Sequence, residues 1–286
     1  MTELGYRAPF AAQPLFRFLG ERAIPGVETF DGRTLRRSIR IGDRASATCA
    51  VTADAATGRL TLQAPADPAT TDAVVTGVRR WLDLDADPAA IGAALSRDPA
   101  MRRFVAAHPG VRVPGAVDGF ELAVRAVLGQ QITVRGARTL AGRIVQAAGT
   151  PIADARDGIT HTFPTAADLA DASLGGLGLT GGRIATLERL SALVAGGEID
   201  LTGAGDRVAT TEALLAIPGV GPWTVAYIAM RALRDPDAFP ATDLGIRRGF
   251  EALGLPATPG AIRERAERWR PYRAYAAMYL WTVAAA

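Results

Sequence analysis

The stretch Leu214-Leu215-Ala216-Ile217-Pro218-Gly219-Val220-Gly221-Pro222-Trp223-Thr224 holds the most informative pattern in this chain of 286 residues. It predicts a helix, a tight hairpin and a second helix. Glycine tolerates the positive φ that such a turn requires and lets the backbone approach a ligand closely. Proline suits the first position of the helix that follows. Because N–H groups exposed at a helix start bind anions, the stretch predicts an anion-binding hairpin.

Apolar residues continue at helical spacing on both sides of this hairpin. They are Leu214, Leu215 and Ile217 before it and Val225, Ile228, Ala229 and Leu233 after it. A hairpin that only packs two helices together would show the same pattern, so packing alone is one interpretation. The other interpretation is that Gly219, Gly221 and Thr224 present backbone N–H groups to a DNA phosphate. We favour the second, since a phosphate is the anion that such a helix start would meet on nucleic acid.

Asp243 lies downstream of the hairpin, in Phe239-Pro240-Ala241-Thr242-Asp243-Leu244-Gly245-Ile246. Its position predicts the N-cap of a helix over Leu244–Leu253. The helix dipole favours an ionised carboxylate there, and such a carboxylate stabilises the positive charge that develops on a sugar when its glycosidic bond breaks. Asp243 is therefore the candidate catalytic residue, able to stabilise that charge and to orient or deprotonate water. A cap without catalysis is the alternative.

Aromatic residues form a second candidate feature of the site. Trp223 and Tyr227 are spaced i, i+4 and therefore share one helix face. Residues on the opposite face can serve the core: Val225, Ile228, Ala229 and Ala232. Aromatic walls suit a flipped base, and cation–π attraction makes them suit a cationic alkylated base better. Trp223 and Tyr227, with Trp281 as a further wall, are candidates for a base pocket, and core packing is the alternative.

Two glutamines follow a helix break at Gly129. Gln130 and Gln131 stand between that break and Thr133, which can cap the next helix. An exposed polar turn is one interpretation of the pair. The other is a wedge that enters a duplex where the target base leaves, with a glutamine amide bonding to the orphaned partner base.

The composition narrows the chemistry that this chain can perform. It is 49% hydrophobic and 21% charged, which supports two or three compact units. All 32 basic residues are arginine, so no lysine is available for a Schiff base. Cys49 is the only cysteine, which excludes a disulfide framework, a multi-cysteine zinc site and a four-cysteine iron–sulfur cluster. His108 and His161 lack metal-ligand spacing. We therefore expect that no cofactor is required.

The formal net charge of +3 is compatible with nucleic acid as a partner. No stretch reaches the 18 or more apolar residues of a membrane span, and the longest candidate is Tyr275–Ala286. The first residues lack the apolar region of a signal peptide. We expect a cytoplasmic protein without a membrane partner, associated with the nucleoid through DNA, and a monomer.

The pattern along the chain changes from strands to helices. Strands are predicted over 34–41, 45–52 and 59–63, with a turn at 54–58 and an amphipathic helix over 71–84, so residues 1–86 form a small α+β unit. Residues 150–164 are expected to form a loop. Further helices are expected at 91–95, 101–107, 118–128, 133–149, 165–172, 182–195, 244–253, 259–269 and 275–286.

Taken together, these residues resemble the 3-methyladenine DNA glycosylase II family of the helix–hairpin–helix base-excision DNA glycosylases. The resemblance extends over nearly the whole chain. It includes the hairpin at 217–224 and four further segments, which are Tyr6-Arg7, Val27-Glu28-Thr29, 125–131 (RAVLGQQ) and 266–276 (AERWRPYRAYA).

The resemblance implies an α+β fold with three domains. The first, at 1–86, would be a small antiparallel sheet domain that resembles half of a TATA-binding protein. Two all-α domains would follow, one at 118–235 with the hairpin and one formed by 87–117 and 236–286, with the active-site cleft between them. Asp243 would be the catalytic carboxylate in the second of these.

The resemblance also implies roles for individual residues. Trp223, Tyr227 and Trp281 would border the base pocket, and Phe18 would reach it as well. The backbone carbonyls of the hairpin would hold a monovalent cation, Na⁺ or K⁺; they belong to Leu215, Ile217 and Val220.

The chain departs from the family pattern at several positions. Trp223 stands where superfamily members that also cut the strand have lysine, which excludes a lysine-dependent lyase. The lack of a cysteine cluster argues against the iron–sulfur branches. Thr242 and Leu244 flank Asp243 where an acidic and an aromatic residue are typical, and Gln131 stands where an aliphatic side chain also occurs. These changes bear on the lesions accepted more than on the reaction.

We expect a monofunctional DNA glycosylase that hydrolyses the N-glycosidic bond of alkylated bases in double-stranded DNA, for base-excision repair. Three alternatives remain open. One is a glycosylase for an oxidised or deaminated base, and another is a non-catalytic protein that binds damaged DNA. The third is an unrelated helical enzyme in which Asp243 only caps a helix. The sequence leaves the ranking of lesions open, and it does not decide between a free-standing chain and part of a fusion.

Overall fold

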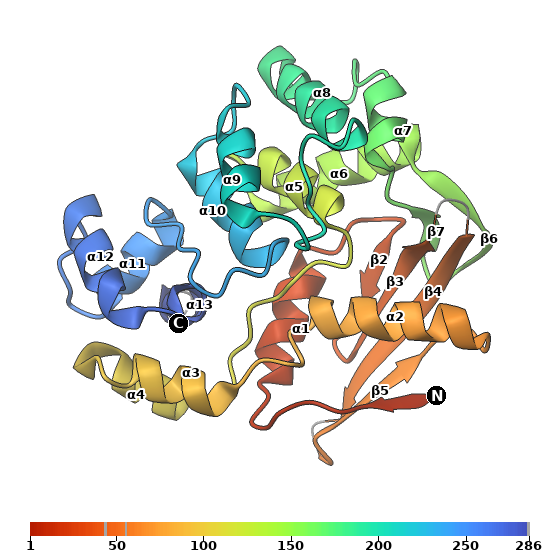
Figure 1. The fold of residues 1–286 in the computed structure, drawn as a ribbon. Helices are drawn as coiled ribbons and strands as arrows, with labels where there is room; N and C mark the ends of the chain where they lie inside the picture. The colour runs from red at the N-terminus through yellow and green to blue at the C-terminus, as the bar shows by residue number, and fades with distance from the viewer. Residues whose placement is uncertain (43–44, 55, 285–286) are drawn as a thin grey trace.

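The computed structural model describes residues 1–42, 45–54 and 56–284. Its N-terminal part is a five-stranded antiparallel sheet in the order β1-β5-β4-β3-β2, packed against two helices (Figure 1). The elements are β1 (Thr2–Leu4), α1 (Ala12–Glu21), β2 (Glu28–Phe30), β3 (Thr34–Ile41), β4 (Ala45–Asp54), β5 (Arg59–Gln63) and α2 (Pro68–Trp81). The predicted strands are confirmed. The predicted turn at 54–58 includes residue 55, which lies outside the described residues.

Helix α2 begins and ends three residues before the predicted 71–84. Asp67 caps it by accepting from the Thr70 N–H, and Pro68 occupies the first helical position. Leu82 and Leu84 belong instead to the tight turn after the helix, where both side chains are fully buried. Because these two buried leucines continue the apolar pattern of the helix, the sequence predicted a helix that extends beyond its true end at Trp81.

Helix α1 was not predicted, and neither were the short edge strands β1 and β2. No side chain caps α1, and its proline, Pro14, stands at the third helical position and not at the first, so the usual start signals are absent. Its buried residues Leu15, Phe16 and Leu19 join the core of the sheet. Tertiary packing therefore stabilises this helix. Its C-terminal half reaches the centre of the molecule, where it meets the helical parts (Figure 1).

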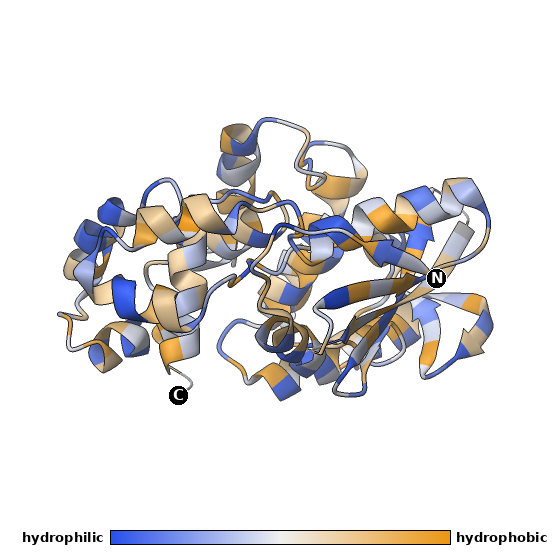
Figure 2. Ribbon diagram, turned by 90° about the horizontal axis from the view of Figure 1, so that it is seen from below, coloured by the Kyte–Doolittle hydropathy of each residue, from blue (hydrophilic) through white to orange (hydrophobic). Residues whose placement is uncertain are grey.

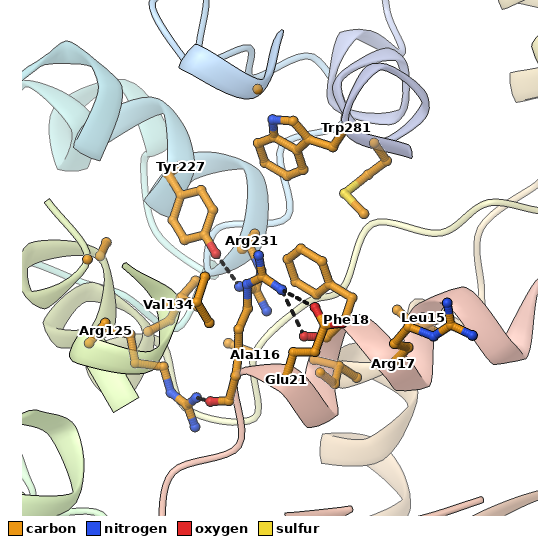
Figure 3. Close-up of a pocket in the computed structure, with 18 of the residues that line it drawn as sticks. Leu15, Arg17, Phe18, Glu21, Ala116, Arg125, Val134, Tyr227, Arg231 and Trp281 are labelled. Atoms are coloured by element: carbon orange, nitrogen blue, oxygen red, sulfur yellow. Dashed lines mark hydrogen bonds and ion pairs between the residues drawn. The ribbon is translucent and has the colours of Figure 1, made fainter. Parts of the chain in front are cut away.

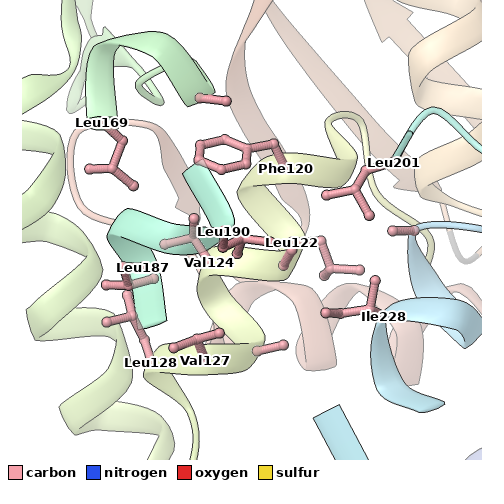
Figure 4. Close-up of a cluster of buried hydrophobic side chains, with 14 of the residues drawn as sticks. Phe120, Leu122, Val124, Val127, Leu128, Leu169, Leu187, Leu190, Leu201 and Ile228 are labelled. Carbon is pink, nitrogen blue, oxygen red and sulfur yellow. The ribbon is translucent and has the colours of Figure 1, made fainter. Parts of the chain in front are cut away.

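A second core fills the space between the helices of the middle of the chain (Figure 4). Helix α5 (Gly119–Leu128) lies at its centre and is buried on most of its faces, with Phe120, Val124 and Leu128 among the buried residues. The surrounding helices are α6 (Val134–Ala148), α7 (Ala166–Asp171), α8 (Gly181–Ala195), α9 (Arg207–Leu215) and α10 (Pro222–Arg231). Asp118 and Thr133 cap α5 and α6, as the sequence predicted.

The expectation of a loop over 150–164 is wrong. These residues form an antiparallel hairpin of β6 (Thr150–Arg156) and β7 (Ile159–Thr162). The turn is Asp157-Gly158, with φ values of 52° and 78°, and Asp-Gly is a strong hairpin signal. The Ser38 hydroxyl of β3 donates to the His161 carbonyl at 2.6 Å, so the hairpin is held against the N-terminal sheet. β6 is largely exposed and lacks an alternating apolar pattern, which explains why periodicity missed it.

The third core joins two separate segments of the chain. Helices α3 (Pro88–Leu95) and α4 (Pro99–Ala107) pack with α11 (Leu244–Ala252), α12 (Pro259–Ala266), the 3₁₀ turn η1 (Glu267–Trp269) and α13 (Arg273–Ala284). The predicted helix over 259–269 changes to a 3₁₀ turn in its last three residues. In this turn the fully buried Trp269 donates its indole N–H to Asp98 at 3.0 Å. Residues 285 and 286 of the predicted terminal helix lie outside the described residues.

Three hydrophobic cores thus occupy the sheet, the middle of the chain and its end, in line with the fold class that the sequence predicted. The domain boundaries at 86, 117 and 235 stay a prediction. Hydrophobic and hydrophilic residues alternate along the elements (Figure 2). Within the described ranges, no helix is both long and apolar enough to span a bilayer.

Candidate active site

Asp243 caps α11, as predicted, and its carboxylate is also held by two indoles. Oδ1 accepts from the Ile246 N–H at 3.0 Å and from the Trp281 Nε1–H at 2.8 Å. Oδ2 accepts from the Trp223 Nε1–H at 2.7 Å. Donors from α10, α11 and α13 therefore fix the orientation of one half-buried carboxylate that lines a pocket.

Four aromatic rings form a continuous wall beside this carboxylate. Trp223 and Tyr227 stack at 5.3 Å between ring centroids with 16° between their planes, so the two share a face as their spacing predicted. Tyr227 lies 6.3 Å from Trp281, and Trp281 stacks with Phe18 at 6.4 Å and 11°. The structure therefore brings together three predicted residues of the helical region and Phe18 of α1.

Two arginines, Arg22 and Arg231, also line the pocket, and Figure 3 shows Arg231 beside the Tyr227 hydroxyl. The guanidinium of Arg22 lies 3.7 Å from the centre of the Phe18 ring. Arg231 is buried, donates to the Tyr227 hydroxyl, and donates from Nε to the Pro114 carbonyl at 2.7 Å. Burial alone would raise the pKa of the Tyr227 phenol, but the charges of Arg231 and Arg22 outweigh burial and lower this pKa.

Sequence reasoning missed both arginines. Each stands four residues after a pocket aromatic, Arg22 after Phe18 and Arg231 after Tyr227, so each shares a helix face with it. This i, i+4 spacing was the signal from which both arginines could have been predicted as pocket residues. Burial lowers the pKa of the Arg22 guanidinium, although it stays charged at neutral pH.

The pocket has a volume of about 930 Å³ and lies where the three cores meet. Its walls come from α1, α5, α6, α10, α11 and α13, and both polar and apolar side chains line it. Tyr227, Arg231, Phe18 and Trp281 point toward one common space, with α1 on one side and α10 and α13 on the other (Figure 3).

The hairpin presents unpaired N–H groups next to this pocket. Gly219 has φ +88°, and a Cβ there would lie 2.2 Å from Thr186 Oγ1, so glycine is required by the turn itself. Gly221 has an ordinary φ of −97° as the N-cap of α10, and a Cβ there would point into open space. The N–H groups of Gly219, Gly221 and Thr224 have no acceptor among the described residues. They are therefore available to an external anion.

The carbonyls of the hairpin are not equivalent. The Ile217 carbonyl accepts from the Val220 N–H at 3.0 Å. In the part of the chain that the structure describes, the carbonyls of Leu215 and Val220 accept no hydrogen bond. Two free carbonyl oxygens beside a third with a spare lone pair fit the donor chemistry of a hard monovalent cation. No cluster of three histidine, cysteine or carboxylate side chains suited to a metal occurs among the described residues.

The two glutamines have different surroundings. Gln130 donates from Nε2 to the Gly219 carbonyl at 2.9 Å and to Thr224 Oγ1 at 2.8 Å, so its side chain ties the loop after α5 to the hairpin. Gln131 is exposed and adopts a positive φ of 55°, which is uncommon for a residue with a side chain. Gln131 is therefore the residue that projects from the surface.

Comparison with known proteins identifies two family regions. Residues 1–118 match the model of the AlkA N-terminal domain, and residues 124–273 match that of the HhH-GPD superfamily base excision DNA repair proteins. Among solved structures, a 3-methyladenine DNA-glycosylase from Archaeoglobus fulgidus has a TM-score of 0.84 at 21% identity, covering 100% of this chain and 98% of the other. That likeness shows the shared fold.

Two curated relatives extend over nearly all of the chain. A probable bifunctional transcriptional activator/DNA repair enzyme AlkA of Mycobacterium tuberculosis is 43% identical over 280 residues, which are 98% of this chain and 56% of that protein. The chain thus spans about half the length of this relative. DNA-3-methyladenine glycosylase 2 of Escherichia coli is 33% identical over 285 residues, which cover 98% of this chain and 96% of that protein.

An antiparallel sheet domain followed by helical units with a helix–hairpin–helix defines the class of fold. The chain belongs to the HhH-GPD superfamily of base excision DNA repair proteins and carries an AlkA N-terminal domain. This confirms the family and the fold class that the sequence predicted.

Proposed function

We propose that this chain is a monofunctional DNA glycosylase, a hydrolase that removes alkylated bases from double-stranded DNA in base-excision repair. The observation that carries the proposal is the Asp243 carboxylate, held by the Trp223 and Trp281 indoles at the mouth of an aromatic pocket. The 33% identity to DNA-3-methyladenine glycosylase 2 over nearly both whole chains supports the same reaction.

In the proposed mechanism the damaged nucleotide leaves the duplex and its base enters the aromatic pocket. Trp223, Tyr227, Trp281 and Phe18 provide π faces, to which an alkylated, positively charged purine is attracted. Such a base is already a good leaving group. As its C–N bond breaks, positive charge builds on the sugar, and the fixed Asp243 carboxylate stabilises that charge and orients the attacking water. The products are the free base and an abasic site.

The chemistry is expected to stop at the abasic site. By the resemblance to the family, Trp223 would stand where superfamily members that cut the strand have lysine, and the sequence has no lysine at any position. The Trp223 indole is hydrogen-bonded to Asp243 and offers no nucleophile. A Schiff base with the sugar would need an amine that no side chain of this chain provides.

The proposed DNA contacts surround the pocket. The free N–H groups of Gly219, Gly221 and Thr224 bind a phosphate, while exposed arginines add affinity that falls with salt. Gln131 enters the duplex in place of the flipped base, and Gln130 fixes the loop that carries it. No cofactor is required. The carbonyls of Leu215, Ile217 and Val220 would hold Na⁺ or K⁺, which would stiffen the hairpin and add positive charge beside the phosphate.

The remaining parts of the proposal concern the setting. We propose that the partner is duplex DNA with damaged bases, that the protein acts as a monomer, and that it works in the cytoplasm at the nucleoid. The finding that no described helix could span a membrane is compatible with this setting.

The decisive experiment measures release of 3-methyladenine and 7-methylguanine from methylated DNA by the wild type and Asp243→Asn. Asparagine keeps the N-cap but removes the charge. Asp206→Asn is the matched control, since Asp206 caps α9 in the same way and does not line the pocket. Release by the wild type and the control, but not by Asp243→Asn, is the expected result. Equal release by all three would refute the role of Asp243.

A glycosylase for oxidised or deaminated bases remains the second candidate. The observation that favours a different lesion range is that the two neighbours of Asp243, Thr242 and Leu244, are unusual and exposed. Duplexes with defined lesions, offered in competition, separate the two candidates. DNA binding without release of any base, and without dependence on Asp243, would favour a damage-binding protein instead.

A further inference from the structure

Four charged side chains form a closed ring between the N-terminal sheet and α5. Arg37 of β3 donates to Glu28 of β2 and to Glu121 of α5, at 2.8 Å in each case. Arg125 of α5 donates to the same two carboxylates from the other side, at 2.5 Å in each case. Each charge therefore faces two opposite charges, and the ring as a whole is neutral.

The ring is largely buried, and all four of its residues also line the pocket. The side chains of Arg37, Glu28 and Glu121 are 4%, 6% and 5% exposed, and that of Arg125 is 18% exposed. Burial alone would raise the pKa of Glu121, but the Arg37 and Arg125 charges lower it. Burial alone would lower the pKa of Arg125, but the two glutamates raise it. Glu121, Arg37 and Arg125 are therefore charged at neutral pH.

Two further bonds connect the ring to the end of α1. Arg125 donates from Nη1 to the carbonyl of Arg22 at 2.8 Å, and Glu28 accepts from the Ile24 N–H at 3.1 Å. Arg22 is the C-cap of α1, directly after its last residue Glu21. Phe18 stands one helical turn earlier and lies under the Arg22 guanidinium. The backbone that follows these two pocket residues is therefore hydrogen-bonded to the ring at the Arg22 carbonyl and at the Ile24 N–H.

We propose that the ring is a positioning device for the base pocket, with Arg125 as its positioning residue. Its role is to fix the end of α1 so that Phe18 completes the aromatic wall against Trp281 and Arg22 lines the pocket. The N-terminal domain would thus act in base recognition, although Asp243 lies in another part of the chain. This inference rests on the proposed function for its catalytic readout but not for its structural one.

The position of the ring distinguishes this role from simple docking of two domains. Arg40 of β3 also bridges the sheet to the helical part, donating to Thr162 Oγ1 at 2.9 Å and to the Phe163 carbonyl at 3.0 Å. It touches neither α1 nor the pocket. If the ring served docking alone, loss of Arg40 and loss of Arg125 would have the same kind of effect.

The test uses the full chain with two variants and one control. Arg125→Gln removes the bond to the Arg22 carbonyl but leaves a buried carboxylate in excess, which could unfold the protein. Glu121→Gln combined with Arg125→Gln keeps the remaining Glu28–Arg37 pair neutral and still removes that bond. Arg40→Gln is the matched control.

The structural readout is amide hydrogen exchange over residues 15–24. We expect faster exchange there in the charge-balanced double variant and unchanged exchange in Arg40→Gln. This readout needs no substrate, so it stands even if the wild type releases no base from methylated DNA, a result that would defeat the proposed function alone. Unchanged exchange over 15–24 in the double variant would overturn the positioning role.

The catalytic readout is base release with enzyme in excess of methylated duplex. We expect the enzyme concentration for half-maximal rate to rise on the order of tenfold in the double variant, with a smaller change in the maximal rate, because base capture is affected more than bond cleavage. The effects of the double variant and of Phe18→Ala on this concentration should be non-additive, since both changes disturb the part of the aromatic wall that Phe18 forms. Additive effects, or an equal effect of Arg40→Gln, would contradict the proposal.

Discussion

Trp223 of α10 and Asp243 at the start of α11 are joined by an indole–carboxylate hydrogen bond of 2.7 Å. Trp281 of α13 forms the matching bond, at 2.8 Å, to the other oxygen. The same tryptophans that line the pocket therefore also orient the carboxylate. In the proposed function, recognition of the base and cleavage of the bond would share these two side chains.

Trp223→Phe keeps an aromatic face and removes one of the donors to Asp243. We expect the maximal rate of base release to fall about tenfold to a hundredfold, by analogy with loss of one preorganised donor, while binding of abasic duplex changes little. Single-turnover kinetics on methylated DNA measure the rate. Trp269→Phe is the control, since it removes an indole–carboxylate bond of 3.0 Å to Asp98 outside the pocket. A loss of rate in Trp269→Phe equal to that in Trp223→Phe would show that the effect is structural.

The two hairpin glycines should respond differently to alanine. At Gly219 the φ of +88° and a contact of 2.2 Å to Thr186 oppose any Cβ, so Gly219→Ala should lower the free energy of unfolding by about 1 to 3 kcal/mol. At Gly221 a Cβ meets open space, so the fold should tolerate Gly221→Ala. That methyl would instead occupy the place proposed for the phosphate, and DNA affinity should fall. Urea unfolding and duplex binding at fixed salt measure the two effects; normal DNA affinity in Gly221→Ala would place the phosphate elsewhere.

Asp83 should make stability depend on pH. It accepts from the Tyr275 hydroxyl at 2.9 Å and the Val113 N–H at 3.2 Å. Burial raises its pKa from 3.8 to about 6, against the opposing effect of these hydrogen bonds and of Arg112. Because the folded state binds the proton more tightly, the contribution is fully present below pH 4 and is lost as the pH rises through 6. Relative to Asp83→Asn, the wild type should lose at most about 3 kcal/mol of unfolding free energy over that range.

Urea unfolding of wild type and Asp83→Asn at pH 4, 5, 6 and 7.5 measures this difference. Asp67→Asn provides a control of opposite sign, since hydrogen bonds from Thr70 lower the pKa of the exposed Asp67 cap. Its stabilising effect is present at neutral pH and is lost as the pH falls through its lowered folded-state pKa. A difference between wild type and Asp83→Asn that stays constant with pH would show that Asp83 keeps an ordinary pKa.

Local patterns in the sequence were enough for much of the candidate site. The N-cap at Asp243 and the shared face of Trp223 and Tyr227 depend on residues within one or two helical turns, and both are present in the structure. The positive φ of Gly219 likewise follows from the turn. These features are visible in a single sequence because chain neighbours determine them.

Other parts of the site depend on contacts between distant segments. Helix α1 has no side-chain cap, so the spacing of Leu15, Phe16 and Leu19 was its only local signal, and its packing against the sheet stabilises it. The i, i+4 spacing places Arg22 beside Phe18 and Arg231 beside Tyr227, but the contact of Arg231 with the Phe18 ring joins helices from distant parts of the chain. The ring of Arg37 and Arg125 with two glutamates likewise joins sheet and helix. Pairing of this kind follows from the fold as a whole and not from any spacing.

Gln131 offers a test of the wedge that separates backbone strain from function. Its φ of 55° costs a residue with a side chain about 1 kcal/mol, so Gln131→Gly should leave the protein equally stable or slightly more stable. The same change removes the side chain proposed to fill the duplex, and base release from double-stranded methylated DNA should fall about tenfold. Release from single-stranded DNA needs no such filling and should stay close to the wild type.

Gln131→Asn tolerates the same φ and keeps a shorter amide, so its rate of release from duplex DNA should lie between those of the wild type and Gln131→Gly. If Gln131→Gly slowed release equally on both substrates, the loop would act on the pocket and not on the duplex, and Gln130, which holds it to the hairpin, would be the residue to change next.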